Sequence, residues 1–533
     1  MKRFLSLMLA LMMVLSLLTA CGGGNDSDSS NNSSSGNNSS SSSNSSGTNT
    51  PSDSSTPAGK AQVTIMAPSF YGGELTKDGS DQVKAAYEEF TNTEVTWRFE
   101  ANDTYADTFG LALMDRSNMP MILTATGEIS GTVIQAAQHG AFWDLTPYLQ
   151  SGEYPYLSQI SEEVLKALTV NGQIIGIPKN REIGRYGLSY RTDWAEAVGI
   201  TEAPKTIEDV YNLLYAFTYN DPDGNGQNDT YGMEMTKYTG PWDIIQTWFG
   251  VGNAWVDQNG DLVPVHETAE YKEALDWMRK IYAEGLVRSD WFTVESSEWG
   301  NGCQSGQAGV YIDTMDGGRR IWDYFVNNDV ASVTDSSALA GMTLAGPIEN
   351  RSLATSGYNG YFLITKDGAK TEEDLKNCLH FLDQMNSIEM RALADFGVEG
   401  LSYDLDDQGG AVMKEGLELA NYPQQGLNQA VAYQPPELDG VLKVTQNERQ
   451  VAQADAYAVC REVAVFNPAA SYLTNSATYA NTQTILKQTI DDARTQYICG
   501  TIDWAGFEAA VVTWESQGGA QVKTEVNEQY HAN

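Results

Sequence analysis

The clearest candidate for binding chemistry in this chain is an acidic loop at residues 221–229, with the sequence Asp-Pro-Asp-Gly-Asn-Gly-Gln-Asn-Asp. With Asp221 as position one, oxygen-bearing side chains fall at positions one, three, five and nine, and Gly226 falls at position six, where an EF-hand loop turns sharply. This spacing gathers oxygen atoms around one point, as a hard cation requires. We therefore predict a Ca²⁺ site whose ligands are Asp221, Asp223, Asn225, Gln227 (through its backbone carbonyl) and Asp229.

The acidic loop departs from the EF-hand pattern at position twelve, which is Gly232 instead of Glu. Glu234 or a more distant carboxylate would have to complete the coordination shell. No nucleophile or base stands beside the loop, so a bound ion would stabilise it and take no part in a reaction. The alternative is a polar Asn/Asp/Gly turn without metal.

The first residues predict export from the cytoplasm. Lys2 and Arg3 precede an apolar run from Phe4 to Leu18, which is too short for a comfortable membrane span. The run ends in Leu-Thr-Ala-Cys, which resembles a bacterial lipobox and implies cleavage before Cys21 and acylation (palmitate) of its thiol. We predict a signal peptide at 1–20 and a lipid anchor on the extracellular face of the membrane, with an ordinary secreted protein as the alternative.

Residues 21–60 form a Ser- and Asn-rich segment without aromatic residues. Such a composition cannot bury enough apolar surface to offset its ordering entropy, so we interpret it as a disordered tether. The globular part begins near residue 61, and its length favours two or three domains.

Composition excludes some partners. The chain has 70 acidic and 32 basic residues and a net charge of −38, which argues against nucleic acid and against anionic lipid beyond the anchor. A neutral ligand fits this charge best. Cys303, Cys378, Cys460 and Cys499 are widely spaced, so their pairing cannot be predicted, and no HxxxH or HxH spacing indicates zinc.

Strand and helix patterns alternate along the chain. Strands are predicted at 63–67, 95–99, 121–124, 174–178, 186–190, 308–313 and 360–365, and helices at 82–91, 109–115, 206–217, 268–284, 372–390 and across much of 451–515. This order is typical of mostly parallel sheets covered by helices. Ligands bind such sheets beyond the carboxyl ends of the strands, which draws attention to the loops 68–74, 102–105 and 125–130.

Several stretches resemble the extracellular solute-binding lipoproteins of bacterial ABC importers, in their carbohydrate-type branch. They are the lipobox and tether, Gly184–Trp194 with Val198-Gly199-Ile200, the acidic loop, Gly306–Tyr311 and Phe396–Gly400. The resemblance implies an α/β, two-lobed periplasmic-binding-protein-like fold with a hinge and an interlobe cleft. It implies lobe 1 at 61–182 with 306–361, and lobe 2 at 183–305 with 362–533.

The same resemblance, combined with strand-end positions, predicts the ligand contacts. They are Phe70, Tyr71, Glu128, Arg181, Tyr186, Trp242, Trp248, Trp299, Tyr311, Asp313, Tyr358 and Asn359. Flat aromatic rings suit the C–H faces of sugars, and polar side chains suit their hydroxyls.

We therefore expect a monomeric, non-enzymatic protein that captures a sugar or oligosaccharide and delivers it to ABC permease subunits. Two alternatives are a receptor for a peptide or other small solute and a surface-anchored glycoside hydrolase. The hydrolase would need two carboxylates flanking the scissile bond, and no triad, HExxH or P-loop motif accompanies the 70 acidic residues.

Overall fold

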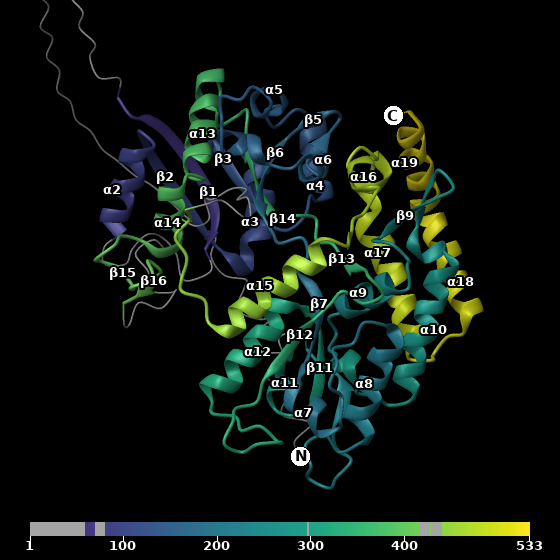
Figure 1. The fold of residues 1–533 in the computed structure, drawn as a ribbon. Coiled ribbons are helices and arrows are strands. Elements are labelled where there is room, and N and C mark those ends of the chain that lie inside the picture. The colour runs from purple at the N-terminus through teal and green to yellow at the C-terminus, as the bar shows by residue number, and fades with distance from the viewer. Residues whose placement is uncertain (1–58, 70–79, 296–297, 415–426, 428–439, 533) are drawn as a thin grey trace, which may run out of the picture. The chain divides into compact units, whose positions relative to one another are not determined.

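The computed structural model describes residues 59–69, 80–295, 298–414, 427 and 440–532 (Figure 1). Residues 1–58, which include Cys21 and most of the tether, lie outside this range, as do Phe70 and Tyr71. The described chain has two main β-sheets, each packed around its own hydrophobic core. In the described residues, no helix is both long and apolar enough to cross a membrane.

The first sheet has the strand order β2-β1-β3-β14-β6. Its strands are β1 (Ala61–Ser69), β2 (Thr93–Ala101), β3 (Ile122–Ala125), β6 (Gly176–Asn180) and β14 (Tyr358–Ile364). β1 pairs in parallel with β2 and β3, and β14 pairs antiparallel with β3 and β6. Buried side chains such as Val63, Ile65 and Leu123 line the sheet because near-continuous apolar runs are needed where both faces are covered. β1 runs through Pro68 to Ser69, past the end predicted at residue 67.

The second sheet has the order β12-β7-β11-β8. Its strands are β7 (Tyr186–Arg191), β8 (Tyr231–Met233), β11 (Ala308–Thr314) and β12 (Met342–Ala345). β11 pairs antiparallel with β7 and parallel with β8, so it belongs to this sheet.

Strand pairing corrects the predicted course of the chain between the lobes. We expected 306–361 to return to the first lobe and the chain to leave it again near 362. Instead, β11 lies in the second sheet and β14 in the first, where Phe362 is paired with Thr124 and Ile177. Both strands are apolar and buried on both faces, so their composition does not distinguish one sheet from the other.

Helices cover the sheets as the periodicity predicts. Those that pack with the first sheet are α2 (Ser80–Phe90), α3 (Tyr105–Met114), α4 (Gly131–Gln138), α13 (Glu372–Gln384) and α14 (Ile388–Phe396). Those of the second lobe are α7 (Thr192–Ala197), α8 (Ile207–Tyr219), α9 (Gly240–Trp248), α10 (Ala269–Ala283) and α12 (Met315–Asn327). Thr206 caps α8 as expected, in a capping box with Asp209.

A C-terminal group of helices completes the fold (Figure 1). They are α15 (Glu448–Arg461), α16 (Ala470–Leu473), α17 (Ala477–Ile498), α18 (Trp504–Trp514) and α19 (Ala520–Ala532). α17 contributes Ala480 to the core of the first sheet and Ala493, Tyr497 and Ile498 to that of the second. A single helix therefore connects both cores.

The remaining elements are short. Strands are β4 (Thr169–Val170), β5 (Gln173–Ile174), β9 (Trp255–Gln258), β10 (Asp261–Pro264), β13 (Ser352–Leu353), β15 (Tyr403–Leu405), β16 (Ala411–Met413) and β17 (Ala464–Val465). Helices are α5 (Thr146–Leu149), α6 (Glu162–Lys166) and α11 (Asn301–Gln304), with single 3₁₀ turns such as η4 (Val265–Glu267).

Candidate functional site

A cavity of about 790 Å³ is lined by residues of both lobes and of the C-terminal helices. Its volume lies in the range typical of small-molecule sites. On the side of the first sheet it is lined by Glu128, Ile129, Arg181, Tyr358 and Asn359; on the side of the second by Tyr186, Asp243 and Gln246; and on α17 by Tyr479, Gln483, Lys487, Asp491 and Arg494.

A second cavity of about 730 Å³ adjoins the first, because both are lined by Arg181, Arg185 and Asn359. Its wall includes Pro68, Asn102 and the turn 125–127, which lie at the carboxyl ends of β1, β2 and β3. Described residues from each of the three segments singled out in the sequence therefore line one cavity, as the strand-end rule predicts.

Five of the predicted contact residues are brought together in the 790 Å³ cavity: Glu128, Arg181, Tyr186, Tyr358 and Asn359. Tyr358 is held in place because its hydroxyl accepts a hydrogen bond from the backbone N–H of Ile129 (3.4 Å). Burial, with the nearby charge of Glu128, keeps the pKa of Tyr358 well above its ordinary value, so its hydroxyl stays protonated. That these five residues touch a ligand stays a prediction.

Two predicted contact residues lie in the hydrophobic core instead. Trp242 is 0% exposed and Trp248 is 2% exposed, and neither lines the two cavities described above. The ring of Trp242 packs edge-on against Trp291, with centroids 5.8 Å apart. α9 is buried over most of its length, so its aromatic residues serve packing. The prediction that they line the cleft is wrong.

Trp299, Tyr311 and Asp313 form a separate polar cluster beside Tyr186. The indole Nε1 of Trp299 donates to Asp313 Oδ2 (2.8 Å), and the hydroxyls of Tyr238 and Tyr311 donate to its two oxygens (3.4 Å each). Burial raises the pKa of Asp313. Burial, with the nearby charge of Asp313, also raises the pKa of Tyr186. None of the three lines the described cavities, so their predicted contact with the ligand is not supported by position.

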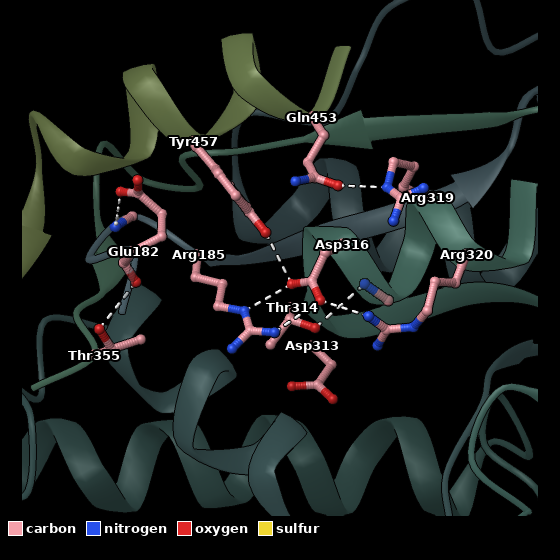
Figure 2. A network of polar contacts seen from close by, with 12 residues as sticks. Glu182, Arg185, Asp313, Thr314, Asp316, Arg319, Arg320, Thr355, Gln453 and Tyr457 are labelled. Atoms are coloured by element: carbon pink, nitrogen blue, oxygen red, sulfur yellow. Dashed lines mark hydrogen bonds and ion pairs between the residues drawn. The ribbon is translucent and has the colours of Figure 1, made fainter. Parts of the chain in front are cut away.

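Arg185 is a firmly anchored charged residue of the cavity wall. Its guanidinium donates two hydrogen bonds to the carboxylate of Asp316 (2.7 Å each), and the same carboxylate accepts from Tyr457 (2.8 Å) and Arg320 (2.6 Å). Figure 2 shows Tyr457, from α15, and Arg185, from the segment before β7, converging on Asp316. These donors hold the pKa of Asp316 well below its usual range despite its burial.

Sequence reasoning missed the residues that α15 and α17 contribute to the cavities. Tyr479, Gln483, Lys487 and Asp491 follow one another at intervals of four on α17, so they share one face of the helix. This spacing was visible, but nothing in the sequence placed that face against a cavity.

The acidic loop curls as its spacing predicts. The N–H of Gly226 donates to Asp221 Oδ2 (3.0 Å), and the Asn225 amide donates to Asp223 Oδ2 (2.7 Å) and Asp229 Oδ1 (3.2 Å). Asp221 Oδ1 is buried and has no hydrogen-bond partner among the described residues. Burial, with the charges of Asp229 and Asp221, raises the pKa of Asp223.

These contacts fit a cation only after a local change. Within the described residues, no group of three or more His, Cys, Asp or Glu side chains is already arranged around a metal position. The Asn225 amide group would have to turn so that its oxygen, not its nitrogen, faces the carboxylates. Glu234 does not complete the shell: its carboxylate accepts from the N–H groups of Gly300, Gly302 and Cys303, at the start of α11.

The cysteines whose pairing was left open are unpaired thiols. Cys303, Cys378 and Cys460 are buried and Cys499 is partly buried. Burial raises the pKa of Cys460 to about 11. It is also the main cause of the raised pKa values of the other three thiols. All four thiols therefore stay protonated and unreactive at neutral pH.

His266, at the end of the cavity formed by the C-terminal helices, makes stability depend on pH. Burial, with a smaller effect of Lys523, lowers the pKa of its imidazole from 6.5 to about 3. Between these values the unfolded chain binds a proton that the folded chain does not, so stability falls as the pH falls through this window.

We expect the wild type to lose about 2 kcal/mol more unfolding free energy than a His266→Phe variant between pH 7 and pH 5. Urea unfolding at the two pH values measures this difference. Equal losses in the two proteins would contradict the burial of a neutral imidazole.

Two α/β lobes, with a ligand-sized cavity lined by both, define the class of two-lobed solute-binding proteins. The chain belongs to the bacterial extracellular solute-binding protein family, whose sequence model matches residues 73–333.

Relatives support this membership along nearly the whole chain. Lipoprotein LipO from Bacillus subtilis (strain 168) is 35% identical over 483 residues, which cover 90% of this chain and 94% of LipO. The polygalacturonan/rhamnogalacturonan-binding protein YtcQ from the same organism is 27% identical and covers 89% of this chain and 92% of its own length.

Solved structures share the fold. An HMO-binding, ABC-transporter-associated solute-binding protein from Bifidobacterium longum infantis ATCC 15697 superposes with a TM-score of 0.65, at 18% identity, over 89% of this chain and 99% of that protein. An EF-hand mutant of the ABC-transporter substrate-binding protein FusA from S. pneumoniae, in complex with fructo-nystose, gives a TM-score of 0.61 at 17% identity, over 88% and 99%. The chain is thus an extracellular solute-binding protein.

Proposed function

We propose that this protein captures an oligosaccharide in the 790 Å³ cavity and delivers it to the permease of an ABC importer. The observation that carries the proposal is the convergence of Tyr186 and Tyr358 with Glu128, Arg181 and Asn359 around one cavity. Tyrosine rings offer apolar faces to sugar rings, and the polar side chains offer hydrogen bonds to hydroxyls. The names of YtcQ and FusA, which refer to carbohydrates, support the same substrate class.

The proposals about oligomeric state, lipid anchoring and domain limits rest on the sequence. We propose a monomer, acylated at Cys21 and held at the extracellular face of the membrane by the tether at 21–60. The domain limit near 182 is also a proposal, with β11 assigned to the second lobe and β14 to the first. Ligand binding would favour a closed form, because a ligand that contacts both lobes binds that form more tightly.

A thermal-shift screen tests the carbohydrate assignment. The panel holds neutral fructo-oligosaccharides, acidic galacturonate oligomers and peptides, and each bound compound is recovered and analysed. We expect an oligosaccharide to raise the melting temperature and to be recovered intact. Stabilisation by peptides alone would favour the peptide-receptor alternative, and shortened oligosaccharide products would favour the hydrolase.

A matched pair of variants locates the binding. Tyr358→Ala, in the cavity wall, should weaken the binding of the oligosaccharide about tenfold or more, because an aromatic contact and its area are lost. Tyr215→Ala, on the exposed face of α8, should leave the affinity unchanged. Equal effects of the two variants would contradict this position for the site.

We also propose that the acidic loop binds Ca²⁺ as a structural ion, held by Asp221, Asp223, Asn225, Asp229 and the carbonyl of Gln227. The unpartnered Oδ1 of Asp221 and the carboxylate cluster support this donor set. When bound, the ion would neutralise the mutual repulsion of the carboxylates.

Calcium at a hundredfold excess over its dissociation constant should therefore raise the free energy of unfolding by about 2.7 kcal/mol. Asp221→Ala should abolish this gain, whereas Asp335→Ala, at an exposed Asp-Ser turn, should retain it. Denaturant unfolding with calcium or with a chelator measures both. An identical gain in unfolding free energy on adding calcium in the two variants would exclude the acidic loop as the calcium-binding site.

A further inference from the structure

The wall of the 730 Å³ cavity carries more positive than negative charge, although the chain as a whole is strongly acidic. Among the described residues of this wall, the cations are Lys179, Arg181 and Arg185, and the anions are Glu182 and Asp316. Exposed charges more than about 8 Å away are largely screened at physiological ionic strength. The groups of the wall therefore decide which ligand charge is favoured here, and the expectation of a neutral ligand, drawn from the net charge, does not extend to this cavity.

Both carboxylates of this wall are already occupied by donors of the protein. Glu182 accepts two hydrogen bonds from the guanidinium of Arg461 (2.9 and 2.6 Å) and one from the N–H of Gly184 (3.0 Å). Asp316 is the acceptor that Arg185 shares with two further donors (Figure 2). Each anion is thus paired with at least one guanidinium, so it repels an incoming anionic group much less than an unpaired carboxylate would.

Arg181 differs from Arg185, because its side chain makes no ion pair or hydrogen bond with any of the described residues. Its backbone is fixed directly after β6, where its N–H donates to the carbonyl of Gly357 (3.0 Å). The residue is partly buried and lines both the 730 Å³ and the 790 Å³ cavity. A partly buried guanidinium without a counter-charge gains a charge-assisted, two-pronged interaction when a carboxylate enters the cavity.

Three exposed asparagines, Asn102, Asn180 and Asn359, line the same cavity. Within the part of the chain that the structure describes, no hydrogen bond occupies their side-chain amides. An amide both donates and accepts, so it suits the hydroxyls of a sugar ring. Asn180 pairs in register with Tyr358, which brings this group beside a predicted aromatic contact. The cavity therefore offers partners for several hydroxyls and, in Arg181, one partner for a carboxylate.

We propose that the bound glycan is acidic, and that a uronate unit lies in the 730 Å³ cavity with its carboxylate against Arg181 and its hydroxyls against the three asparagines. This inference rests on the proposed function and names its substrate class. Arg181 and Asn359 line both cavities, so the next sugar unit continues into the 790 Å³ cavity, toward Tyr186 and Tyr358. Glu128 lines only the 790 Å³ cavity and is not in the wall that receives the uronate.

Two probes that differ only in charge test the carboxylate site. They are trigalacturonate and its fully methyl-esterified form, each titrated calorimetrically into the protein. Arg181→Gln removes the charge and keeps a hydrogen-bonding side chain, whereas Arg181→Lys keeps the charge and loses the two-pronged geometry. The matched control is Arg116→Gln, because the side chain of Arg116 is 77% exposed and lines neither cavity.

The wild type should bind the acid about tenfold or more tightly than the ester, since hydrogen bonds between charged groups are the stronger ones. Arg181→Gln should reduce this preference about tenfold and leave the affinity for the ester within about twofold, and Arg181→Lys should retain part of the preference. Arg116→Gln should keep all of it. Arg181→Gln should also unfold at the same urea concentration as the wild type, because Arg181 stabilises no described residue through its side chain.

Equal affinity of the wild type for the acid and the ester would overturn the inference and leave the proposed function intact. An unchanged preference in Arg181→Gln would also overturn it, because the carboxylate would then bind elsewhere. A wild type that binds neither probe but binds fructo-nystose would be a receptor for neutral glycans, which contradicts the inference alone. A wild type that binds none of the three compounds would contradict the proposed function, and the inference with it.

Discussion

Asp316→Ala should lower the free energy of unfolding by about 3 kcal/mol, because it removes the acceptor shared by Arg185, Tyr457 and Arg320. The side chains of Asp316 and Arg185 are only 13% and 17% exposed, so the guanidinium would be left with little water to replace its partner. The remaining buried cation accounts for most of the loss. Since the pKa of Asp316 is lowered in the folded protein, its contribution is complete above about pH 4 and is lost as the pH falls below that value.

Guanidinium chloride unfolding at pH 7 measures this loss. The matched control is Asp290→Ala, which removes the bidentate partner of Arg288 at a site where the carboxylate is 59% exposed. That change should cost less than about 1 kcal/mol, since exposed ion pairs contribute little. Similar losses in the two variants would show that the Asp316 network behaves as an exposed one. Asp316→Ala should also weaken glycan binding, because Arg185 lines both cavities.

Gly131→Ala should destabilise the protein by about 3 kcal/mol and weaken glycan binding tenfold or more. A methyl group at Gly131, in the first turn of α4, would lie 2.1 Å from the carbonyl oxygen of Ala480 and 2.7 Å from the Gln483 amide nitrogen. The first of these is backbone, so α4 and α17 must move apart. α17 carries Tyr479, Gln483 and Lys487 into the cavity, so the shift displaces part of the binding wall.

Gly110→Ala is the control for this second prediction. Gly110 also lies in a helix, α3, but a methyl group there meets nothing within 4 Å. It should raise the stability by about 0.5–1 kcal/mol and leave the affinity unchanged. Denaturant unfolding and calorimetric titration of both variants provide the comparison. Changes of the same sign in the two would mean that backbone entropy, not the contact between α4 and α17, sets the effect.

Local patterns predicted most elements because the signals that define them lie within one segment. Thr206 and Asp209 mark the start of α8, and the apolar run from Val63 marks β1. The two-lobed fold followed from the alternation of such segments and from the resemblance to solute-binding lipoproteins, and relatives and solved structures confirm it.

Pairing between distant segments was not predictable in the same way. β11 and β14 are similar apolar strands, and only contacts between segments far apart in the sequence assign each to its sheet. The burial of Trp242 has a similar cause, because α9 is covered on nearly all sides by elements far along the chain. The cavity face of α17 was also missed, because the elements that form the rest of the cavity lie far from α17 in the sequence.

The central claim is that an intact oligosaccharide binds between the two lobes, against Glu128, Tyr186 and Tyr358. A crystal structure of the protein with its bound glycan tests this most directly. We predict continuous density for an unbroken oligosaccharide in the 790 Å³ cavity, in contact with these three side chains. Density for the glycan at another surface, with this cavity filled only by solvent, would contradict the account.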